Sequence, residues 1–532
     1  MSILSRSVES LPVDTTYTGS PINNITRGLP KNIQSICPEC AKVIPARMFE
    51  ENGKVYMEKT CPEHGYVKDL YWSDVELYLK ADKWVFGDGK GLQNPFTYSE
   101  VCPKDCGLCQ NHTSHTSLGN IDLTNRCNLT CPICFANANV TGRVYEPSKE
   151  EVFQMLKLYR TEQPVSGRMV QFSGGEPTLH PDFFEIIVEA KKIGFSHIQI
   201  ASNGIKLADP DFAARAAEAG LHTVYLQFDG VDDRVYKITR GRPLFALKEK
   251  AIQSIRRAGM KIVFVPTIAG GINEDQVGPI LRYALENIDV LSGISYQPVS
   301  LVGRISKAER ESLRFTLPDL ARCIEEQTGI CNKDDWYPLS FVSPISKIIS
   351  ALRGAETVNI SCHPHCSLGT YLFIEHGTGR AIPITRFVDV EGMFSELEKI
   401  AEKAKASRFK RFAQMSAFYK TQKYFNKEKA PKGLDFTKFL QTLDGFFDKE
   451  AGRGEKDGTY TNKTLLVAGM HFMDAYNFDL ERVRRCVIHY ATPGGKIIPF
   501  CAYNGGLVHR TAIESQFSIP MEEYKKNHQA LS

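Results

Sequence analysis

Three cysteines in the middle of the chain have the spacing that an iron–sulfur cluster needs. Cys127, Cys131 and Cys134 form a C-x3-C-x2-C pattern. Three thiolates in one short loop can hold three irons of a [4Fe–4S] cube, which leaves the fourth iron without a protein ligand. A cluster that only transfers electrons, or a zinc loop, is an alternative that the spacing alone leaves open.

Two polar turns follow this loop and could complete a ligand site beside the open iron. In SGGEP, Gly174 and Gly175 let the backbone approach a ligand, and Glu176 can accept a hydrogen bond from an ammonium group. In SNG, the side chains of Ser202 and Asn203 suit ribose hydroxyls. Together with the open iron, these groups indicate S-adenosylmethionine (SAM), which can chelate iron through its amino and carboxylate groups.

Strands that alternate with helices must position these groups. Five βα repeats between residues 119 and 300 predict a parallel sheet, open or curled into a partial barrel, whose chemistry lies at the carboxyl ends of the strands. The predicted strands lie within residues 119–124, 168–175, 197–204, 223–230, 261–271 and 293–299.

The combination resembles the radical SAM superfamily over residues 119–300. The resemblance implies that the three cysteines bind the cluster, that the SGGEP turn contacts the methionine amino group of SAM, and that the SNG turn contacts its ribose. Phe135 and the stretch from Ile268 to Gly271 would contact the adenine. The resemblance also implies an electron donor such as ferredoxin or flavodoxin, and anaerobic chemistry.

Two charged residues have a weaker assignment. Asp229 and Arg240, in FDGVDDRVYKITRG, lie where that superfamily has carboxylate and substrate contacts. Solvated loop charges are an equally good interpretation of both.

A second group with the same spacing, Cys102, Cys106 and Cys109, precedes the first by 25 residues. No strand leads into it, and the glycine-rich turns are in register with the later loop, so we expect an auxiliary [4Fe–4S] cluster here. Its fourth ligand could be His112 or a distant residue, Cys323 and Cys331 being weak candidates.

Four ligands near the amino terminus have the spacing of a zinc ribbon or a rubredoxin-like iron site. These are Cys37, Cys40, Cys61 and His64. Thiolates accept either metal, so the sequence predicts mononuclear iron or zinc without separating them. A purely structural role, in which the metal holds together a knuckle too small for its own core, is the simplest interpretation.

The carboxy-terminal part holds four further cysteines that could bind a second auxiliary cluster: Cys362, Cys366, Cys486 and Cys501. A zinc site, or buried cysteines without a metal, are the alternatives. His363 and His365, between the first two, are either ligands or residues that orient the loop.

We therefore predict an α/β protein with a partial (β/α)6 TIM-like barrel of the radical SAM type. A small cysteine-rich metal knuckle precedes the barrel and a C-terminal α+β extension follows it. The expected divisions are 1–95 (arm and knuckle), 96–118 (auxiliary cluster), 119–330 (barrel) and 331–532 (extension, second auxiliary cluster and substrate cover). Residues 1–36 lack periodicity and are expected to form an arm draped over another part of the protein.

Composition and charge exclude several classes of protein. The 65 basic and 61 acidic residues give a net charge of +4, so no overall field indicates a nucleic-acid partner. The chain begins without the apolar segment of a signal peptide, and it has no apolar run of about 18 residues that could span a bilayer. We expect a cytoplasmic protein whose fifteen cysteines bind metals more than they form disulfides.

A basic stretch from Lys403 to Lys432 carries ten Lys or Arg and one Glu, with aromatic residues at helical spacing. It predicts a helix with a cationic face and an aromatic face. Such a helix either packs its aromatic side on the protein or binds the inner face of a membrane peripherally, which would matter if the substrate were a lipid.

The whole order of motifs, from residue 30 to residue 505, is similar to that of archaeal radical SAM proteins that make tetraether lipids, a group also described as methylating a pterin precursor. The resemblance implies C–C bond formation between the terminal methyl carbons of isoprenoid lipid chains. The alternative is a radical SAM methyltransferase for a 7,8-dihydropterin precursor. A second alternative, from another class, is an iron–sulfur electron carrier without catalysis.

Overall fold

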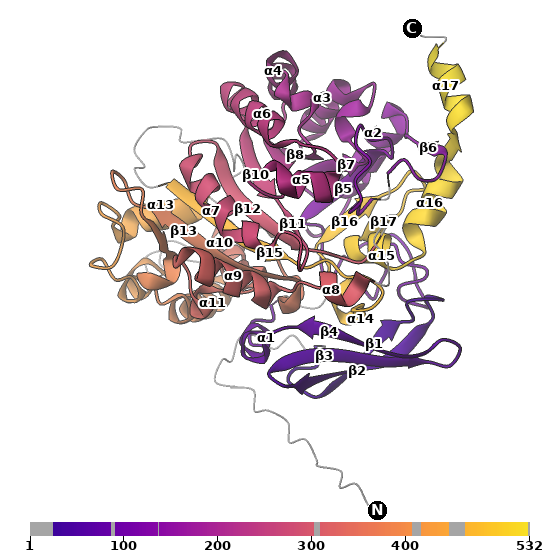
Figure 1. Ribbon diagram of the computed structural model, residues 1–532. Coiled ribbons are helices and arrows are strands. Elements are labelled where there is room, and N and C mark those ends of the chain that lie inside the picture. Colours follow the sequence, from indigo (N-terminus) through magenta and orange to yellow (C-terminus); the bar gives the residue numbers. More distant parts are fainter. Residues whose placement is uncertain are drawn as a thin grey trace, which may run out of the picture.

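A twelve-stranded sheet forms the centre of the computed structural model, which describes residues 25–86, 91–136, 138–302, 309–406, 417–445 and 463–529 (Figure 1). Its middle consists of six parallel strands in chain order, as predicted from the sequence. They are β5 (Leu118–Thr124), β7 (Met169–Gly174), β8 (His197–Ser202), β9 (Thr223–Gln227), β10 (Lys261–Val265) and β12 (Leu291–Pro298), and the short β11 (Thr267–Ile268) pairs with β12. The predicted α/β fold with a central parallel sheet is confirmed.

The two faces of these strands differ in chemistry. One face is apolar and packs on the helices, as Ile198 and Ile200 of β8 illustrate, since both are fully buried in the main core. On the other face, the Gln171 side chain donates to Asn120 Oδ1 at 2.8 Å and accepts from Gln199 Nε2 at 2.7 Å. The interior of the partial barrel is therefore polar near β5, β7 and β8.

Amphipathic helices cover the outer face. Helix α2 begins at a capping box in which Ser148 and Glu151 exchange hydrogen bonds, and α3 ends at Gly194, whose φ of 102° is left-handed. The helices are α2 (Lys149–Arg160), α3 (Phe183–Ile193), α4 (Pro210–Ala219), α5 (Asp233–Arg240), α6 (Phe245–Arg257), α7 (Val277–Glu286) and α9 (Leu317–Thr328).

Strands from the carboxy-terminal part extend the sheet at both edges, so the sheet continues past residue 330. At the β5 edge, β16 (Ile488–Ala491) pairs in parallel with β5 and turns into β17 (Ile497–Pro499). At the β12 edge lie β15 (Lys463–Met470), β13 (Ser367–Ile374) and β14 (Ala381–Pro383).

The amino-terminal knuckle is a separate four-stranded antiparallel sheet followed by one helix. It consists of β1 (Lys31–Ile36), β2 (Val43–Glu51), β3 (Lys54–Cys61), β4 (Gly65–Trp72) and α1 (Val75–Asp82). The prediction that residues 1–36 form an arm is wrong for Lys31–Ile36, because Ile33 and Ile36 are buried and β1 pairs with β2 along its whole length. Polar side chains between the two isoleucines hid this alternation.

Apart from β6, the remaining α-helices and strands come from residues 310–529. In Figure 1, α16 and α17 run along one side of the molecule, beside β6 (Arg143–Tyr145), which pairs with β18 (Ser518–Pro520). The others are α8 (Arg310–Leu313), α10 (Ser343–Arg353), α11 (Val390–Ala406), α13 (Phe436–Gly445), α14 (Leu480–Arg484), α15 (Phe500–Gly505), α16 (His509–Phe517) and α17 (Met521–Gln529).

The expected basic helix from Lys403 to Lys432 is not continuous. Residues 417–421 are helical, a 3-10 turn follows at Gln422–Tyr424, and the chain then runs irregularly to α13. Phe418 packs against the core around α11, whereas Tyr419 is 69% exposed. Phe409, Phe412 and Met415, which carried the aromatic pattern, lie outside the described residues. In the part of the chain that the structure describes, no helix has the length and apolar character needed to cross a bilayer.

A buried ion cluster joins the knuckle to the rest of the molecule. Arg314, only 2% exposed at its side chain, contacts Asp69 of β4 and Asp474 at 2.8 Å each. Asp474 also accepts a hydrogen bond from the Leu301 backbone, just past β12. Because each charge is removed from water, each depends on its partners.

Arg314→Met should therefore destabilise the protein by about 3–5 kcal/mol, since it leaves Asp474 buried without its counterion. Denaturant-induced unfolding measures the change. The control is Arg322→Met on α9. The Arg322 side chain is 53% exposed, so its ion pairs with Asp319 and Glu326 should contribute only about 0–1 kcal/mol to the free energy of unfolding. Equal effects of the two substitutions would contradict a special role for the buried cluster.

Candidate active site and metal centres

The first cysteine group lies in the loop that leaves β5 at the carboxyl edge of the sheet. Asn203 Nδ2 lies 3.9 Å from Cys127 Sγ and donates to Asn128 Oδ1 at 2.7 Å. Burial raises the pKa of the Cys127 thiol to about 12, and Glu176 and the neighbouring thiols add to the effect. Three crowded thiols of this kind suit a cationic metal cluster, which would neutralise them as thiolates.

Asn139 holds this loop, and sequence reasoning missed it. Its side chain accepts from Cys127 N at 3.1 Å and donates to the Cys127 and Leu129 carbonyls at 2.8 and 3.2 Å. Its φ of 64° is left-handed, a conformation that asparagine tolerates. The only signal in the sequence was an asparagine shortly after the last cysteine.

The SGGEP turn packs its backbone directly on the cysteine loop. Gly175 N donates to Thr124 O at 2.6 Å, and Glu176 N donates to Arg126 O at 2.8 Å. A Cβ atom at Gly174 would lie 2.2 Å from Thr124 O, and one at Gly175 would lie 2.2 Å from Arg126 O. Both glycines are therefore required by this close approach, in addition to any ligand contact.

Glu176 joins the ends of β7 and β8. Its carboxylate is 1% exposed and accepts from Thr178 Oγ1 at 2.6 Å, Ser202 Oγ at 2.9 Å and Asn203 N at 2.8 Å. Burial raises its pKa above the ordinary value. The predicted residues Glu176, Ser202 and Asn203 thus come together as one hydrogen-bonded unit beside Cys127.

Asp229 and Arg240 form a buried pair at the end of β9, so the interpretation as solvated loop charges is wrong. Arg240 Nε and Nη2 donate to the two Asp229 oxygens at 2.5 and 3.0 Å, and Arg240 Nη1 donates to Ile133 O at 3.1 Å. Burial alone would raise the pKa of Asp229, but the Arg240 charge and hydrogen bonds hold it below its ordinary value. The pair therefore ties β9 to the cysteine loop as a permanent ion pair.

Lys248 on α6 is a second residue that sequence reasoning missed. It is fully buried, and its Nζ donates to Asn203 O at 2.6 Å and to Gln227 Oε1 at 2.7 Å. Burial lowers the pKa of Lys248 to about 7. Because α6 reads as an ordinary amphipathic helix, nothing in the sequence distinguished this lysine from its exposed neighbours.

The two predicted adenine contacts differ in position. Ile268 is fully buried in the main core. Phe135 is partly buried, and its ring stacks on Phe500 of α15 with centroids 5.6 Å apart. Phe135 also lines a cavity.

That cavity, of 240 Å³, lies between the cysteine loop, the end of β12 and the helices α15 and α16. Val302, just past β12, contributes one wall, which places the cavity over the mouth of the barrel. Its lining residues are Phe135, Ala136, Thr141, Arg143, Val302, Tyr503, Asn504, Leu507, Val508, Arg510, Thr511, Glu514, Ser515 and Ser518.

The second cysteine group folds into a tight loop held by the carboxy-terminal part. Burial and the neighbouring thiols of Cys102 and Cys109 raise the pKa of Cys106, so the three lie together. His112 directs Nε2 at Cys486 O, 2.8 Å away, and at His489 Nε2. Its Nε2 is therefore engaged by these partners. Cys323 and Cys331 lie in the main core near Tyr296, away from this loop.

The four carboxy-terminal cysteines also converge. Burial and the thiols of Cys501 and Cys366 raise the pKa of Cys486, and burial together with Cys366 raises that of Cys362. The Arg482 guanidinium is buried, which would lower its pKa, but the Cys366 thiol raises it above the ordinary value. A buried cation beside four thiols suits thiolate ligands of a metal centre.

The two histidines of this loop are engaged in packing. His365 stacks on the Tyr78 ring at 3.9 Å, and His363 Nδ1 accepts from His365 N at 3.2 Å. These contacts fit the expectation that the histidines orient the loop.

The knuckle brings its four predicted ligands into one cluster. Cys37, Cys40, Cys61 and His64 offer ligand atoms that all lie within 4.8 Å of one another. His64 Nδ1 is 3.6 Å from Cys37 Sγ and 3.5 Å from Cys61 Sγ, and the Cys40 and Cys61 sulfurs are 4.0 Å apart. A tetrahedral metal with bonds of about 2.0–2.3 Å separates its ligands by roughly 3.5–3.8 Å, so the group fits zinc or iron.

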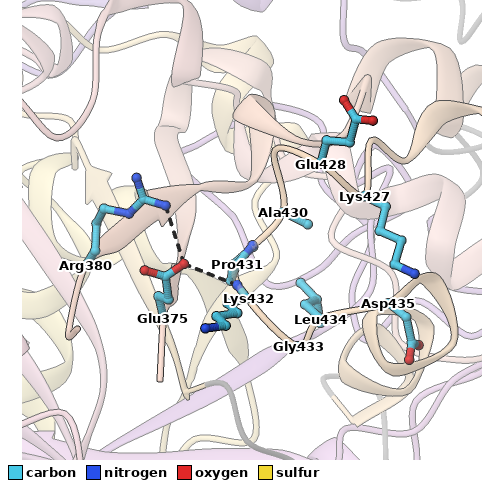
Figure 2. Close-up of a pocket in the computed structure, with 10 residues that line it drawn as sticks. All are labelled: Glu375, Arg380, Lys427, Glu428, Ala430, Pro431, Lys432, Gly433, Leu434 and Asp435. Carbon is cyan, nitrogen blue, oxygen red and sulfur yellow. Dashed lines mark hydrogen bonds and ion pairs between the residues drawn. The ribbon is translucent and has the colours of Figure 1, made fainter. Parts of the chain in front are cut away.

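A larger hollow of 520 Å³ lies at the far edge of the sheet, beyond β13. Glu375 accepts from Arg380 Nη2 at 3.4 Å and from Lys432 N at 3.2 Å, and Lys427 and Asp435 flank them (Figure 2). None of the described residues that line it is a cysteine, so it is not a candidate for iron–sulfur chemistry.

Comparisons with known proteins agree with this geometry. Residues 121–284 match the family model of the radical SAM superfamily, and residues 29–73 match the HMPTM N-terminal zinc ribbon domain. The chain is 45% identical over 503 residues to 7,8-dihydro-6-hydroxymethylpterin dimethyltransferase of Methanocaldococcus jannaschii, a match that covers 94% of this chain and 97% of that protein.

More distant relatives match shorter parts of the chain. A probable GTP 3',8-cyclase of Methanopyrus kandleri is 37% identical over 186 residues, which is 35% of this chain and 57% of the cyclase. Among solved structures, Streptococcus suis SuiB bound to the precursor peptide SuiA aligns over 41% of this chain and 46% of its own, with 19% identity and a TM-score of 0.34.

Gly175→Ala should reduce both the iron bound at the cysteine loop and SAM cleavage, by at least about tenfold, because the new Cβ collides with Arg126 O. Iron per chain and 5′-deoxyadenosine formed from SAM are the measurements. Gly494→Ala is the control, since its nearest new neighbour is Phe517 at an ordinary 3.5 Å. Full activity of the Gly175 variant would contradict the close backbone approach.

Lys248→Met should weaken SAM binding by about tenfold or more, because it removes two hydrogen bonds that fix the Asn203 backbone and Gln227. Equilibrium binding of SAM to the reconstituted protein measures the effect. Lys250→Met, an exposed position on the same helix, should leave it unchanged. If both variants bind SAM like the unaltered protein, Lys248 does not position the SNG turn.

Proposed function

Because this chain belongs to the radical SAM superfamily, and within it to the family of the M. jannaschii 7,8-dihydro-6-hydroxymethylpterin dimethyltransferase, we propose that it is a methyltransferase for a reduced pterin precursor. It is a radical SAM enzyme, so the interpretation as a non-catalytic electron carrier is dropped. The end-to-end identity with that relative carries the substrate assignment. The sequence-based expectation of lipid coupling has no comparable support.

The chemistry of the cavity supports a polar heterocycle. Asn504, Arg510 and Glu514 offer hydrogen-bonding groups, and the aromatic ring of Phe135 can lie against a flat ligand. The amide ladder of β5, β7 and β8 continues this polarity inside the barrel. A pterin presents both an aromatic-like face and a hydrogen-bonding edge, and both find partners here.

A lipid chain would need a long apolar groove at the same place. An apolar cavity of 150 Å³ does occur, but it is lined by Tyr337, Phe341, Ile345 and Phe394, among the helices α10 and α11. None of the residues lining it belongs to the cysteine loops. It is therefore a gap in the packing of the carboxy-terminal part and gives no support to lipid coupling.

Each part of the site has a proposed task. Cys127, Cys131 and Cys134 would hold a [4Fe–4S] cluster that, with SAM bound, supplies a 5′-deoxyadenosyl radical for hydrogen abstraction. Gly174, Gly175 and Glu176 would form the wall near the methionine amino group, with Ser202 and Asn203 toward the ribose. The Asp229–Arg240 pair orients the cysteine loop through Ile133 O, and the packing of α15 and α16 restricts the access of water.

The other metal centres complete the proposal. Cys102, Cys106 and Cys109 would hold one auxiliary cluster, and Cys362, Cys366, Cys486 and Cys501 a second. Cys102 and Cys106 of the first group, and Cys486 and Cys501 of the second, belong to or pack against the apolar cluster that also contacts Phe135. This cluster therefore connects both groups with the cysteine loop of the active site. A ferredoxin or flavodoxin would supply the electron, and the mononuclear metal of the knuckle would be structural.

The test is to supply the anaerobically reconstituted enzyme with SAM, a reductant and 7,8-dihydro-6-hydroxymethylpterin, and to identify the products by mass spectrometry. We expect 5′-deoxyadenosine together with a methylated pterin. One SAM should give 5′-deoxyadenosine and methionine, and a second SAM should donate its methyl group to the pterin and leave as S-adenosylhomocysteine, with the reductant supplying the electrons. Cys127→Ala should abolish both products. Cys106→Ala should spare SAM cleavage and stop methylation, because it removes a ligand of the proposed auxiliary cluster only.

A parallel reaction with an archaeal phospholipid in place of the pterin is the control. Coupled lipid chains with an unchanged pterin would overturn the proposal in favour of lipid synthesis. If Cys106→Ala abolished SAM cleavage while Cys127→Ala retained it, the roles of the two loops would have to be exchanged.

A further inference from the structure

At the cavity at the mouth of the barrel, two carboxylates are paired with a single arginine. Arg510 Nη2 lies 3.0 Å from Asp122 Oδ2, and Arg510 Nη1 lies 3.2 Å from Glu514 Oε1. Asn504 Oδ1 accepts from the same guanidinium at 2.7 Å. Two carboxylates and an amide oxygen therefore share one cation, at side chains that are 3–14% exposed.

The other cation of the cavity does not restore the balance. The Arg143 guanidinium turns onto Ser518, donating from Nε to the hydroxyl at 2.8 Å and from Nη2 to the carbonyl. Burial raises the pKa of the Glu514 carboxyl above its ordinary value, although Arg510 opposes this. Among the described residues that line the cavity, Glu514 is the only carboxylate. Arg510 and Asn125 donate to it, and a carboxylate can accept about four hydrogen bonds, so its two oxygens can still accept from a ligand.

The position of Glu514 is fixed by its surroundings. It lies one turn after Arg510 on α16. The Arg510 guanidinium lies 4.9 Å from the centroid of the Tyr503 ring. Tyr503 in turn stacks on Tyr490, with ring centroids 4.4 Å apart. Phe135, which also lines the cavity, is held by its contact with Phe500. An acceptor near a rigid aromatic wall matches a flat ligand with donors along one edge.

We propose that Glu514 recognises the substrate by accepting the two parallel N–H donors, at N3 and at the 2-amino group, of a pterin ring bound in this cavity. The inference rests on the proposed function and adds the residue that determines specificity. A carboxylate and two adjacent N–H groups form a bidentate pair, and a hydrogen bond to a charged acceptor contributes more than a neutral one. At 240 Å³ the cavity is smaller than the range of about 300–1,000 Å³ for drug-sized ligands, which suits a bicyclic ring.

Guanine carries the same donor edge, so the chemistry alone would also fit a guanine nucleotide. The cavity lining argues for the pterin, since Arg143 and Arg510 are both engaged and no further Lys or Arg among the described lining residues could bind a triphosphate. Binding of GTP is therefore a separate arm of the test.

The experiment measures dissociation constants by calorimetry on the full, anaerobically reconstituted chain. The probes are 7,8-dihydro-6-hydroxymethylpterin and its 2-oxo counterpart, in which a carbonyl acceptor replaces the 2-amino donor. The unaltered protein should bind the pterin at least about tenfold more tightly. Glu514→Gln should weaken pterin binding by about tenfold to a hundredfold and abolish the preference, because an amide can donate to the 2-oxo ring.

The control is Glu523→Gln, an exposed carboxylate on α17 that does not line the cavity and should leave all constants unchanged. If the unaltered protein binds no pterin, the proposed function itself fails. If it binds pterin without a preference over the 2-oxo ring, or if Glu514→Gln keeps that preference, the function stands and the role of Glu514 is wrong. The comparison of the pterin with its 2-oxo counterpart in the unaltered protein needs no variant. Tighter binding of GTP than of the pterin would also overturn the assignment of this cavity to a pterin.

Discussion

The backbone contact between the first two strand ends is the constraint on which the site depends. Gly175 and Glu176 donate to the carbonyls of Thr124 and Arg126, so the turn after β7 and the cysteine loop after β5 form one continuous unit. Glu176 carries this unit on to Ser202 and Asn203, and the buried Lys248 and the Asp229–Arg240 pair extend it to β9. Four strand ends are thereby held at fixed spacing through buried polar groups, each of which is costly to leave unpaired. A ligand that spans these ends finds its groups in place before it binds.

The carboxy-terminal part is built into the barrel and does not merely cover it. Its strands lie on both edges of the sheet, and its helices α15 and α16 supply most of the polar lining of the cavity. The buried Arg314 joins this part to the knuckle through Asp474 and Asp69. The buried Arg482 lies beside the carboxy-terminal cysteines Cys366 and Cys501. A chain with the same central strands and a different carboxy-terminal part would therefore present a different cavity, which is how one fold serves several substrates.

Much of the fold and of the metal chemistry could be predicted because both leave local patterns. The six central strands, the ribbon cysteines and the SGGEP and SNG turns are all carried by short segments. Strand β1 was missed because polar side chains lie between its buried isoleucines, and Lys248 was missed because its partners are distant in sequence. Asn139 lies only 12 residues from Cys127, but a single asparagine in a loop carries no pattern that marks it. Local patterns say less about the substrate, since the shape and polarity of a cavity arise from residues such as Phe135 and Glu514, which only the folded chain brings together.

The pairing of β5 with β16 also has a consequence for how the protein is made. Leu118 lies opposite Ile488, so the edge of the first barrel strand stays open until nearly the whole chain has left the ribosome. At about 5–20 residues per second, that delay amounts to tens of seconds. During this interval Cys102, Cys106 and Cys109 lack the clamp that Arg484 and Cys486 later provide. Nascent chains would thus expose thiols to oxygen and an open strand edge to other chains, which makes prompt iron–sulfur assembly part of successful folding.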